Sequence, residues 1–577
     1  MKADLTRDTF HPLKHYARVL TQQGRVQLDA DMNEQAAILL RYLHILAADL
    51  IGPAGGPVDP QGNVGFAISA LTPAPNPPDF QIGFGNYYVK GLLCQADFVP
   101  IAIFPTSTAN PNVFQVMNWN SDFELKTIPY FELFDDTTAS TFKPVLVQIA
   151  NPSQALGQIT ISNLPATFSS IANPKLRRVI TYLHQPDFVF STKSNPVSPP
   201  PLLPPNNTGT VFLQIYLDVW ERAITYAEDD SIREVALGGP DTAARTKLVW
   251  QVKSTQLATE ADPVCMTPQQ LYAQILAELQ GRTEPPFQPQ PRGWLQAMAK
   301  QSSPSPNPCI INPNAAYTGP ENQLYRVEIN RSGAAGTTPG SSATFKWSRE
   351  NGSVIYPIAS GGGSASVVVE SLGRDDRFGL VEGNLVEVQD DRSVLSNLPG
   401  NLLPVQSINS TTMTVTLNGT PDGVLGSDET LHPLLRRWDQ ASGDKAEGGL
   451  TLDTDNAAFV EEGVWLTLED GVQIRFQPAD PVDPKTPPVN QYLTGDYWLI
   501  PARTATGDVE WPKVLGADGN PETDAQGNII PVALPPHGIT HYYAPLAVVS
   551  VSANGVFVET NCRSSFPPGA VPMPKKP

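Results

Sequence analysis

The sequence has few charged residues for its length, and basic residues are the scarcer kind. Asp, Glu, Lys and Arg make up 16% of the 577 residues, and the formal net charge at pH 7 is −19. Phosphate groups are bound by basic surfaces, so this balance argues against nucleic acid as a partner. It equally disfavours docking on an anionic membrane.

Long apolar runs are also missing. None reaches the length of a membrane-spanning helix. The first residues, Met1-Lys2-Ala3-Asp4, lead into a polar segment and not into the apolar centre of a signal peptide. We therefore expect synthesis in the cytoplasm, no membrane insertion, and release, if it occurs, by lysis.

Cysteine is rare, and its spacing fits no metal site. The four cysteines are Cys94, Cys265, Cys309 and Cys562, with no Cys-x-x-Cys pair among them. A cytoplasmic origin disfavours structural disulfides, so buried free thiols are expected. Cys265 and Cys309 bracket a predicted helical insert and are the one pair worth testing.

Proline and glycine, by contrast, are abundant. There are 58 prolines and 43 glycines, while apolar residues make up 41% of the chain. This mixture is typical of a loop-rich β protein. We predict a mainly β fold of several β-sandwich or small-barrel modules with an N-terminal helical assembly arm. The expected divisions are an arm at 1–52, a β-rich domain at 53–195, a proline-rich linker at 196–208, a β-rich domain at 209–372 with a helical insert near 267–300, a small barrel at 373–430, and a β-rich domain at 431–577.

One stretch near the start organises the rest. After an extended segment with a turn at Gly24, Asp29 or Asp31 is placed to cap a helix that runs from Met32 to about Leu50. Gly52 supplies the stop. Apolar residues cover more than one face of this helix, which is typical of an ordinary core helix or of an assembly helix. If it is an assembly helix, the predicted interface residues are Leu39, Leu43, Leu46 and Leu50.

A long alternating strand is predicted from Val211 to Arg222, with its aliphatic residues on the core side. Asp218 and Glu221 could be a catalytic carboxylate pair, but in a strand they point to opposite faces. Structural ion pairs are the favoured interpretation. In it Arg222, Arg233 and Arg245 pair with Asp218, Glu221, Asp229 or Asp241.

Other chemical motifs are absent or incomplete. There is no Gly-x-Ser-x-Gly, and no glycine-rich loop ends in Gly-Lys-Ser/Thr. His537 and His541 have the four-residue spacing of a helical metal pair, but Pro535, Pro536 and Gly538 disfavour a helix there. We expect no catalytic residues, no metal and no cofactor. Tryptophans could form a sugar-binding platform, although they are more often core residues.

A family resemblance extends over nearly the whole chain. The Gln23-Gly24-Arg25 turn with its acidic cap and Asn33-Glu34-Gln35 is similar to a motif in phage baseplate and tail-fibre-attachment proteins. The longer stretch from Thr6 to Pro53 resembles an uncharacterised bacterial family associated with phage-tail-like contractile injection systems. Later matching segments are Glu321–Glu328, Phe345–Ser353, Leu372–Asp376, Leu435–Asp439, Gly495–Trp498 and Cys562-Arg563.

The resemblance implies a structural component of a contractile injection particle, at the baseplate, the spike surround or a fibre-attachment point. Its expected partners are other subunits of such a particle and further copies of itself, as a trimer or hexamer. Two alternatives stay open: a fibre-like protein that binds carbohydrate or a cell surface, and, less favoured, a glycan-degrading enzyme.

Overall fold

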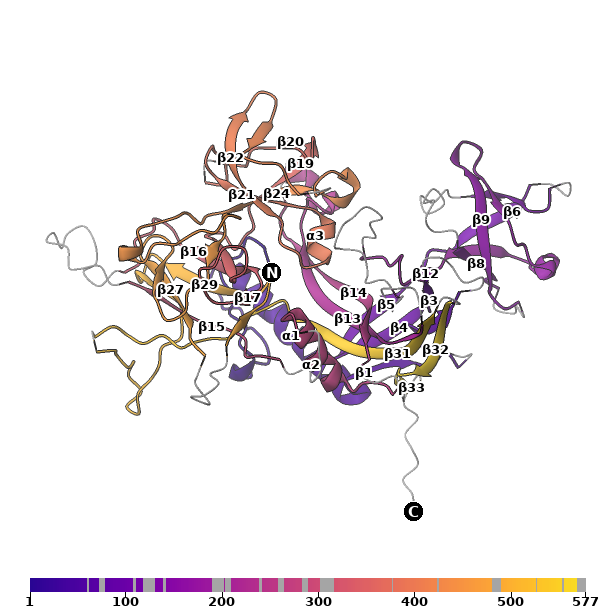
Figure 1. Ribbon diagram of the computed structural model, residues 1–577, viewed down its shortest axis with the longest axis horizontal. Helices are drawn as coiled ribbons and strands as arrows, with labels where there is room; N and C mark the ends of the chain where they lie inside the picture. Colours follow the sequence, from indigo (N-terminus) through magenta and orange to yellow (C-terminus); the bar gives the residue numbers. More distant parts are fainter. Residues whose placement is uncertain are drawn as a thin grey trace, which may run out of the picture.

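Figure 1 shows the computed structural model of the chain, which is built mainly from β-sheets with few helices. The predicted fold class, β modules with an N-terminal helical arm, is confirmed. The structure describes residues 1–59, 62–71, 78–106, 110–117, 130–137, 142–188, 202, 209–237, 241–257, 264–282, 289–300, 316–375, 377–422, 425–479, 489–525, 527–552 and 555–567. No helix within these ranges has both the length and the apolar character needed to cross a membrane.

The centre of the molecule is a β-sandwich. Its larger sheet has the strand order β14 (Arg245–Gln256), β13 (Val211–Ile224), β31 (Tyr542–Ser552) and β32 (Gly555–Asn561). Two smaller sheets share its core. One has the order β33 (Ser565–Phe566), β1 (Ala54–Pro57), β4 (Gly85–Val89) and β5 (Leu92–Ala96). The other has the order β12 (Ile180–Thr181), β3 (Phe80–Ile82) and β2 (Ile68–Ala70).

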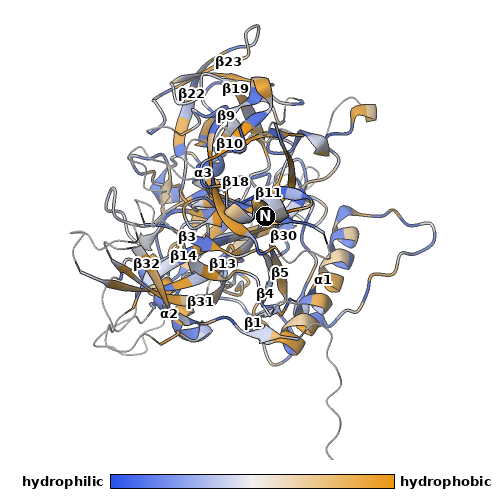
Figure 2. Ribbon diagram, turned by 90° about the vertical axis from the view of Figure 1, so that its right-hand side faces the viewer, coloured by the Kyte–Doolittle hydropathy of each residue, from blue (hydrophilic) through white to orange (hydrophobic). Residues whose placement is uncertain are grey.

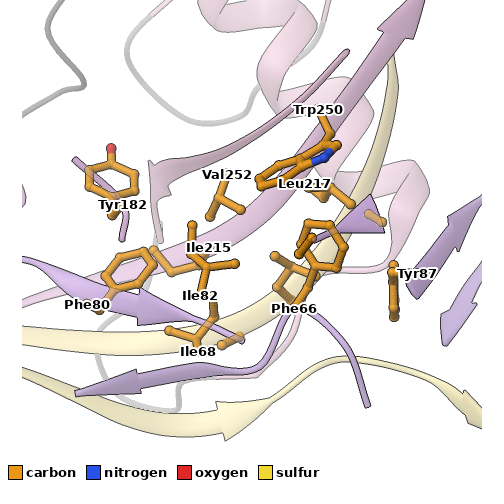
Figure 3. Packing of buried hydrophobic residues seen from close by; sticks show 14 of the residues in the cluster. Phe66, Ile68, Phe80, Ile82, Tyr87, Tyr182, Ile215, Leu217, Trp250 and Val252 are labelled. Carbon is orange, nitrogen blue, oxygen red and sulfur yellow. The ribbon is translucent and has the colours of Figure 1, made fainter. Parts of the chain in front are cut away.

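The predicted aliphatic face of β13 is the core side of this sandwich. Leu213, Ile215, Leu217 and Val219 are all buried in the central core. Figure 3 shows Ile215 and Leu217 meeting aromatic side chains from the smaller sheets and Trp250 from β14. The opposite face of β13 is covered as well, which explains why every residue from Leu213 to Trp220 is buried.

The sandwich is assembled from segments that are far apart in the chain. Strand β13 pairs with β14 and also with β31, so one core draws on the expected segments 53–195, 209–372 and 431–577. The other modules are inserted between its strands. The first is a closed barrel at one end of the molecule (Figure 1). Its strand order is β10 (Gln158–Ile161), β7 (Val113–Val116), β6 (Ile101–Pro105), β11 (Pro174–Arg178), β8 (Tyr130–Asp135) and β9 (Val145–Ser153).

A second sandwich lies at the other end (Figure 1). Its five-stranded sheet has the order β25 (Ala458–Phe459), β18 (Thr344–Ser348), β16 (Gln323–Arg331), β29 (Tyr497–Arg503) and β30 (Asp508–Val509). The same core contains the sheet β15 (Trp294–Ala299), β27 (Val472–Gln477) and β26 (Leu466–Thr467). Two short strands, β17 (Gly333–Ala334) and β28 (Gln491–Tyr492), pair beside it.

The small barrel expected at 373–430 lies within a larger closed barrel. Its order is β19 (Ile355–Ser360), β20 (Ser366–Val369), β23 (Thr414–Leu417), β22 (Asn401–Asn409), β21 (Leu385–Gln389) and β24 (Leu434–Trp438). Strands β19 and β24 pair with each other and close it, so the module extends from Ile355 to Trp438.

Three α-helices occur in the described ranges. They are α1 (Asp29–Ile51), α2 (Pro268–Leu279) and α3 (Asp391–Leu395). Helix α2 begins with the capping box of Thr267 and Gln270, and α1 ends at Gly52 as predicted. Single 3-10 turns occupy Pro12–Lys14, Gln154–Leu156, Ala166–Ser170, Asp230–Ile232, Val235–Leu237, Glu429–Leu431 and Lys445–Glu447.

The expectation of free thiols was wrong for one pair. Cys265, just before α2, is disulfide-bonded to Cys562, just after β32. The two residues are 297 positions apart, so nothing local in the sequence indicates the pairing. Cys94 is a buried free thiol, as expected. Cys309, the partner considered for Cys265, lies outside the described residues.

Candidate functional site

The predicted interface residues of α1 all lie on its solvent side. Leu39, Leu43, Leu46 and Leu50 are 53%, 60%, 57% and 78% exposed, respectively. Figure 2 shows α1 at the edge of the molecule, with apolar residues along its length. Scattered exposed leucines are ordinary, but a contiguous apolar patch marks an interaction surface. The exposed side of α1 is therefore the first candidate site.

The opposite side of α1 packs on its own chain. Ala30 and Ile38 are 1% and 2% exposed, and the β4–β5 turn at Gly91 lies against the backbone of His44. The prediction that Asp29 or Asp31 caps the helix was wrong: α1 begins at Asp29, and Leu28 is the N-cap without a side-chain bond.

Long-range contacts explain why the predicted cap does not form. The Asp29 carboxylate accepts hydrogen bonds from the Thr6 N–H at 3.0 Å and from the Thr6 hydroxyl at 2.7 Å. Nearby, the Thr9 hydroxyl donates to Glu34 at 2.7 Å. The acidic residues of the first helical turns thus fasten the preceding segment to α1.

The segment before α1 carries further exposed apolar side chains. Leu13, Tyr16, Leu20 and Val26 all lie on its surface. It is held to α1 at few points, one being the Val19 N–H, which donates to Gln35 at 2.7 Å. Figure 2 shows this segment as a loop extending beside α1. We call residues 9–51, comprising this loop and α1, the arm.

The predicted ion-pair residues of β13 have other partners than expected. Asp218 pairs with Lys253 and with His541, each at 2.7 Å. Lys253 stands opposite Tyr216 in the β13–β14 register, diagonal to Asp218 on the same face. Burial raises the pKa of Asp218, but the neighbouring His541 and Lys253 more than offset this and lower it to about 2.

The arginine pairings were also predicted wrongly, because the arginines meet close neighbours in the chain and residues of another module. Arg222 pairs with Glu228 at 2.8 Å and with Asp391 of α3 at 3.5 Å. The remaining arginines are Arg233, which pairs with Asp230 and Glu370, and Arg245, which donates to the carbonyls of Ala243 and Ala244. Asp241 meets Arg233 only through the backbone, and Asp229 caps the turn at Ser231.

Glu221 departs most from its predicted role. It is exposed, and among the described residues it makes no ion pair. It lines a cavity of about 320 Å³ at the junction of the central sandwich, the second barrel and the second sandwich. Asp218 is buried and paired. The two carboxylates therefore do not form one open catalytic pair.

The cavity walls carry many charged residues, and some of these charges pair with each other. Asp391 binds His432 at 2.7 Å as well as Arg222. Arg436 donates from Nε to Gln389 at 2.8 Å and from Nη1 to the carbonyl of Gly352. These groups fix the modules relative to one another.

A buried ion cluster, which the sequence analysis missed, joins the second sandwich to the second barrel. Lys346 of β18 lies 2.8 Å from Glu387 of β21 and 3.6 Å from Glu328 of β16. Glu328 also binds Arg326 at 2.6 Å and Lys2 at 2.9 Å. In β16 and β18 these charged residues alternate with the core residues, so they lie on the strand face that points away from the sandwich core.

The two histidines with metal-like spacing have separate surroundings. His541 bonds to Asp218, whereas the ring of His537 stacks on Tyr497 with centroids 5.8 Å apart. In the part of the chain that the structure describes, no three His, Cys, Asp or Glu side chains are grouped to hold a metal ion.

The tryptophans considered for sugar binding are core residues. Trp220, Trp250, Trp347, Trp438, Trp498 and Trp511 are each 6% exposed or less. Their indole N–H groups find internal acceptors in several cases; that of Trp438, for example, donates to Glu387 at 2.7 Å. These six therefore cannot form an exposed stacking platform.

The profile of a family of unknown function, DUF6519, matches residues 1–136, 206–271 and 288–568. The chain belongs to this family. The match includes the whole arm, the cavity-lining residues and the buried ion cluster. No curated protein and no solved structure matches the chain.

Proposed function

We propose that this protein is a structural subunit of a phage-tail-like contractile particle, docked onto neighbouring subunits through its arm. The observation that carries the proposal is the exposure of Leu39, Leu43, Leu46 and Leu50 along one helix. Leaving such a surface in water is unfavourable, and burying a leucine side chain contributes about 1.5–3 kcal/mol. A binding partner removes this surface from water.

The remainder of the molecule suits a scaffold. Buried ion pairs, such as that of Lys346 with Glu387, connect its modules. The central sheet also pairs strands that are far apart in the chain, such as β13 and β31. Such connections hold the modules in a fixed arrangement behind the arm. The family resemblance supplies the contractile-particle context, in which the arm docks and the β modules project.

The test is incorporation into particles. Cells that make the particle would carry either the unaltered chain or the double variant Leu39→Asp, Leu43→Asp, and particles would be purified by sedimentation and examined by negative-stain microscopy. We expect the unaltered chain to sediment with the particles and the variant to stay in the soluble fraction. Circular dichroism of the purified variant should show that its β modules remain folded.

Two results would contradict the proposal. One is an unaltered chain that never sediments with sheath or tube subunits. The other is a double variant that is incorporated as well as the unaltered chain.

A further inference from the structure

Six of the exposed apolar residues of α1 follow a heptad pattern. Met32, Ala36, Leu39, Leu43, Leu46 and Leu50 are separated in turn by four, three, four, three and four positions, and all six are exposed. This alternation has a period of 3.5 residues, that of the a and d positions of helices that wind around one another. We call these six residues the seam.

The seam lies opposite the side that α1 uses within its own chain. In the heptad assignment that places Ala36 and Leu43 at a positions, the buried Ile38 falls at c, and the partly buried Arg41 and Ala48 fall at f. The f position is diametrically opposite the a/d seam. Folding of this chain therefore uses one side of α1 and leaves the seam uncovered.

The pattern indicates what covers the seam. A 3.5-residue repeat fits another helix, because side chains spaced in this way insert between those of a helix with the same repeat. A membrane surface fits poorly, since α1 carries Asp29, Asp31, Glu34 and Asp49 against a single Arg41, and interfacial helices are rich in basic residues.

The other helices of the described ranges cannot supply the partner. Helix α2 has 12 residues and buries Leu271 and Ile275 against Tyr216, and α3 has only five residues. Helix α1, with 23 residues, has the required length and repeat. The helix that matches the seam of one copy is therefore α1 of another copy.

We infer that the α1 helices of three or more copies of this chain pack along their seams in a parallel bundle. The number follows from the flanks of the seam: Leu40 at an e position and Tyr42 at a g position are apolar and exposed. A dimeric coiled coil usually has charged residues there, whereas larger bundles bury an apolar face wider than a and d alone. When three or more copies are related by one rotation axis that runs along the bundle, their helices are parallel.

This inference rests on the proposed function and names the partner of the same surface. It is tested on the purified full chain by light scattering, followed by mild oxidation of single-cysteine additions. We expect a mass of at least three times 62.3 kDa. In a parallel bundle identical d positions meet, so Leu46→Cys should link copies covalently. Ile45→Cys, at an exposed c position of the same helix, should link few.

Matched charge variants complete the test. Leu43→Asp should shift the mass to that of a single chain, whereas Ile45→Asp should leave the oligomer intact. A monomeric or dimeric unaltered chain would overturn the inference. An oligomer in which neither Leu46→Cys nor Ile45→Cys forms a disulfide between copies would overturn it as well. If the unaltered chain is monomeric but still enters particles through its arm, only the identification of another copy as the partner is wrong, and the proposed function stands. Failure to enter particles contradicts the proposed function itself.

Discussion

Gly91 lies directly against the backbone of His44. A Cβ built on Gly91 would be 2.1 Å from the His44 carbonyl oxygen, too close for any real contact. Gly91 also has φ +80°, in the left-handed region that favours glycine, as the second residue of the β4–β5 turn. This contact seats the inner side of α1 on the central sandwich and so determines which side faces outward.

Replacing Gly91 should therefore loosen the arm. For Gly91→Ala we expect a loss of about 2–4 kcal/mol in the free energy of unfolding, or local detachment of α1. Thermal unfolding and limited proteolysis within residues 9–51 measure the two outcomes. Gly24→Ala is the matched control, because Gly24 has φ +70° but no atom near its Cβ position. Equal behaviour of the two variants would show that the His44 contact is unimportant.

The buried ion cluster should be a main determinant of stability. Glu328→Gln removes the charge that Arg326, Lys346 and Lys2 share. Removing one member of a buried pair leaves an uncompensated charge, so we expect a loss of about 3–5 kcal/mol in chemical denaturation.

Glu221→Gln is the control for this measurement. If Glu221 formed the ion pair predicted from the sequence, this change would destabilise the fold. Because Glu221 is exposed and without an ion pair among the described residues, we now expect an effect within about 0.5 kcal/mol. A large loss in the free energy of unfolding for Glu221→Gln, together with a small loss for Glu328→Gln, would show that Glu221 and not Glu328 stabilises the fold.

The buried Asp218 should make stability sensitive to acid. Its pKa is about 2 in the folded protein, below its ordinary value of 3.8. A carboxylate with a lowered folded pKa stabilises the protein above its unfolded pKa, and this contribution is lost as the pH falls from about 4 to about 2. The shift corresponds to about 2 kcal/mol.

Asp218→Asn should lack this part of the acid dependence. Urea denaturation between pH 2 and pH 7 would show a steeper fall for the unaltered chain below pH 4, and a variant that is less stable at pH 7. Identical slopes for both proteins in this window would mean that Lys253 and His541 do not hold the carboxylate charged.

The disulfide should be detectable without unfolding assays. Alkylation in denaturant without a reductant is expected to modify Cys94 and to leave Cys265 and Cys562 unmodified, as read by mass spectrometry. After reduction both should react. The bond closes a very long loop, and loss of such a bond costs about 2–5 kcal/mol, so Cys562→Ser should lower the thermal midpoint. Alkylation of Cys562 before reduction would contradict the pairing.

The local features were predictable because local residues determine them. Helix α2 begins at the Thr267–Gln270 capping box, α1 ends at Gly52, and the aliphatic positions of β13 face the core. Several of the failures involve partners that are distant in the chain. Thr6 takes the carboxylate of Asp29 that was expected to cap α1. The partners of Asp218 depend on the pairing of β13 with β14 and on His541, 323 positions away.

The candidate site was partly predictable for the same reason. The four leucines of α1 could be named from periodicity alone, and exposure of all four follows from the structure. Which side of α1 is covered depends on Gly91 and on the segment preceding the helix. The sequence could not show this, because an apolar helix in a core and one at an interface have similar composition.

Cryo-electron microscopy of the purified particles tests the central claim most directly. A map at side-chain resolution should contain this chain, with Leu39, Leu43, Leu46 and Leu50 buried against another helix and the β modules projecting from it. Particles that are complete without the chain would contradict the account. So would a map in which the chain is present and these four leucines face solvent.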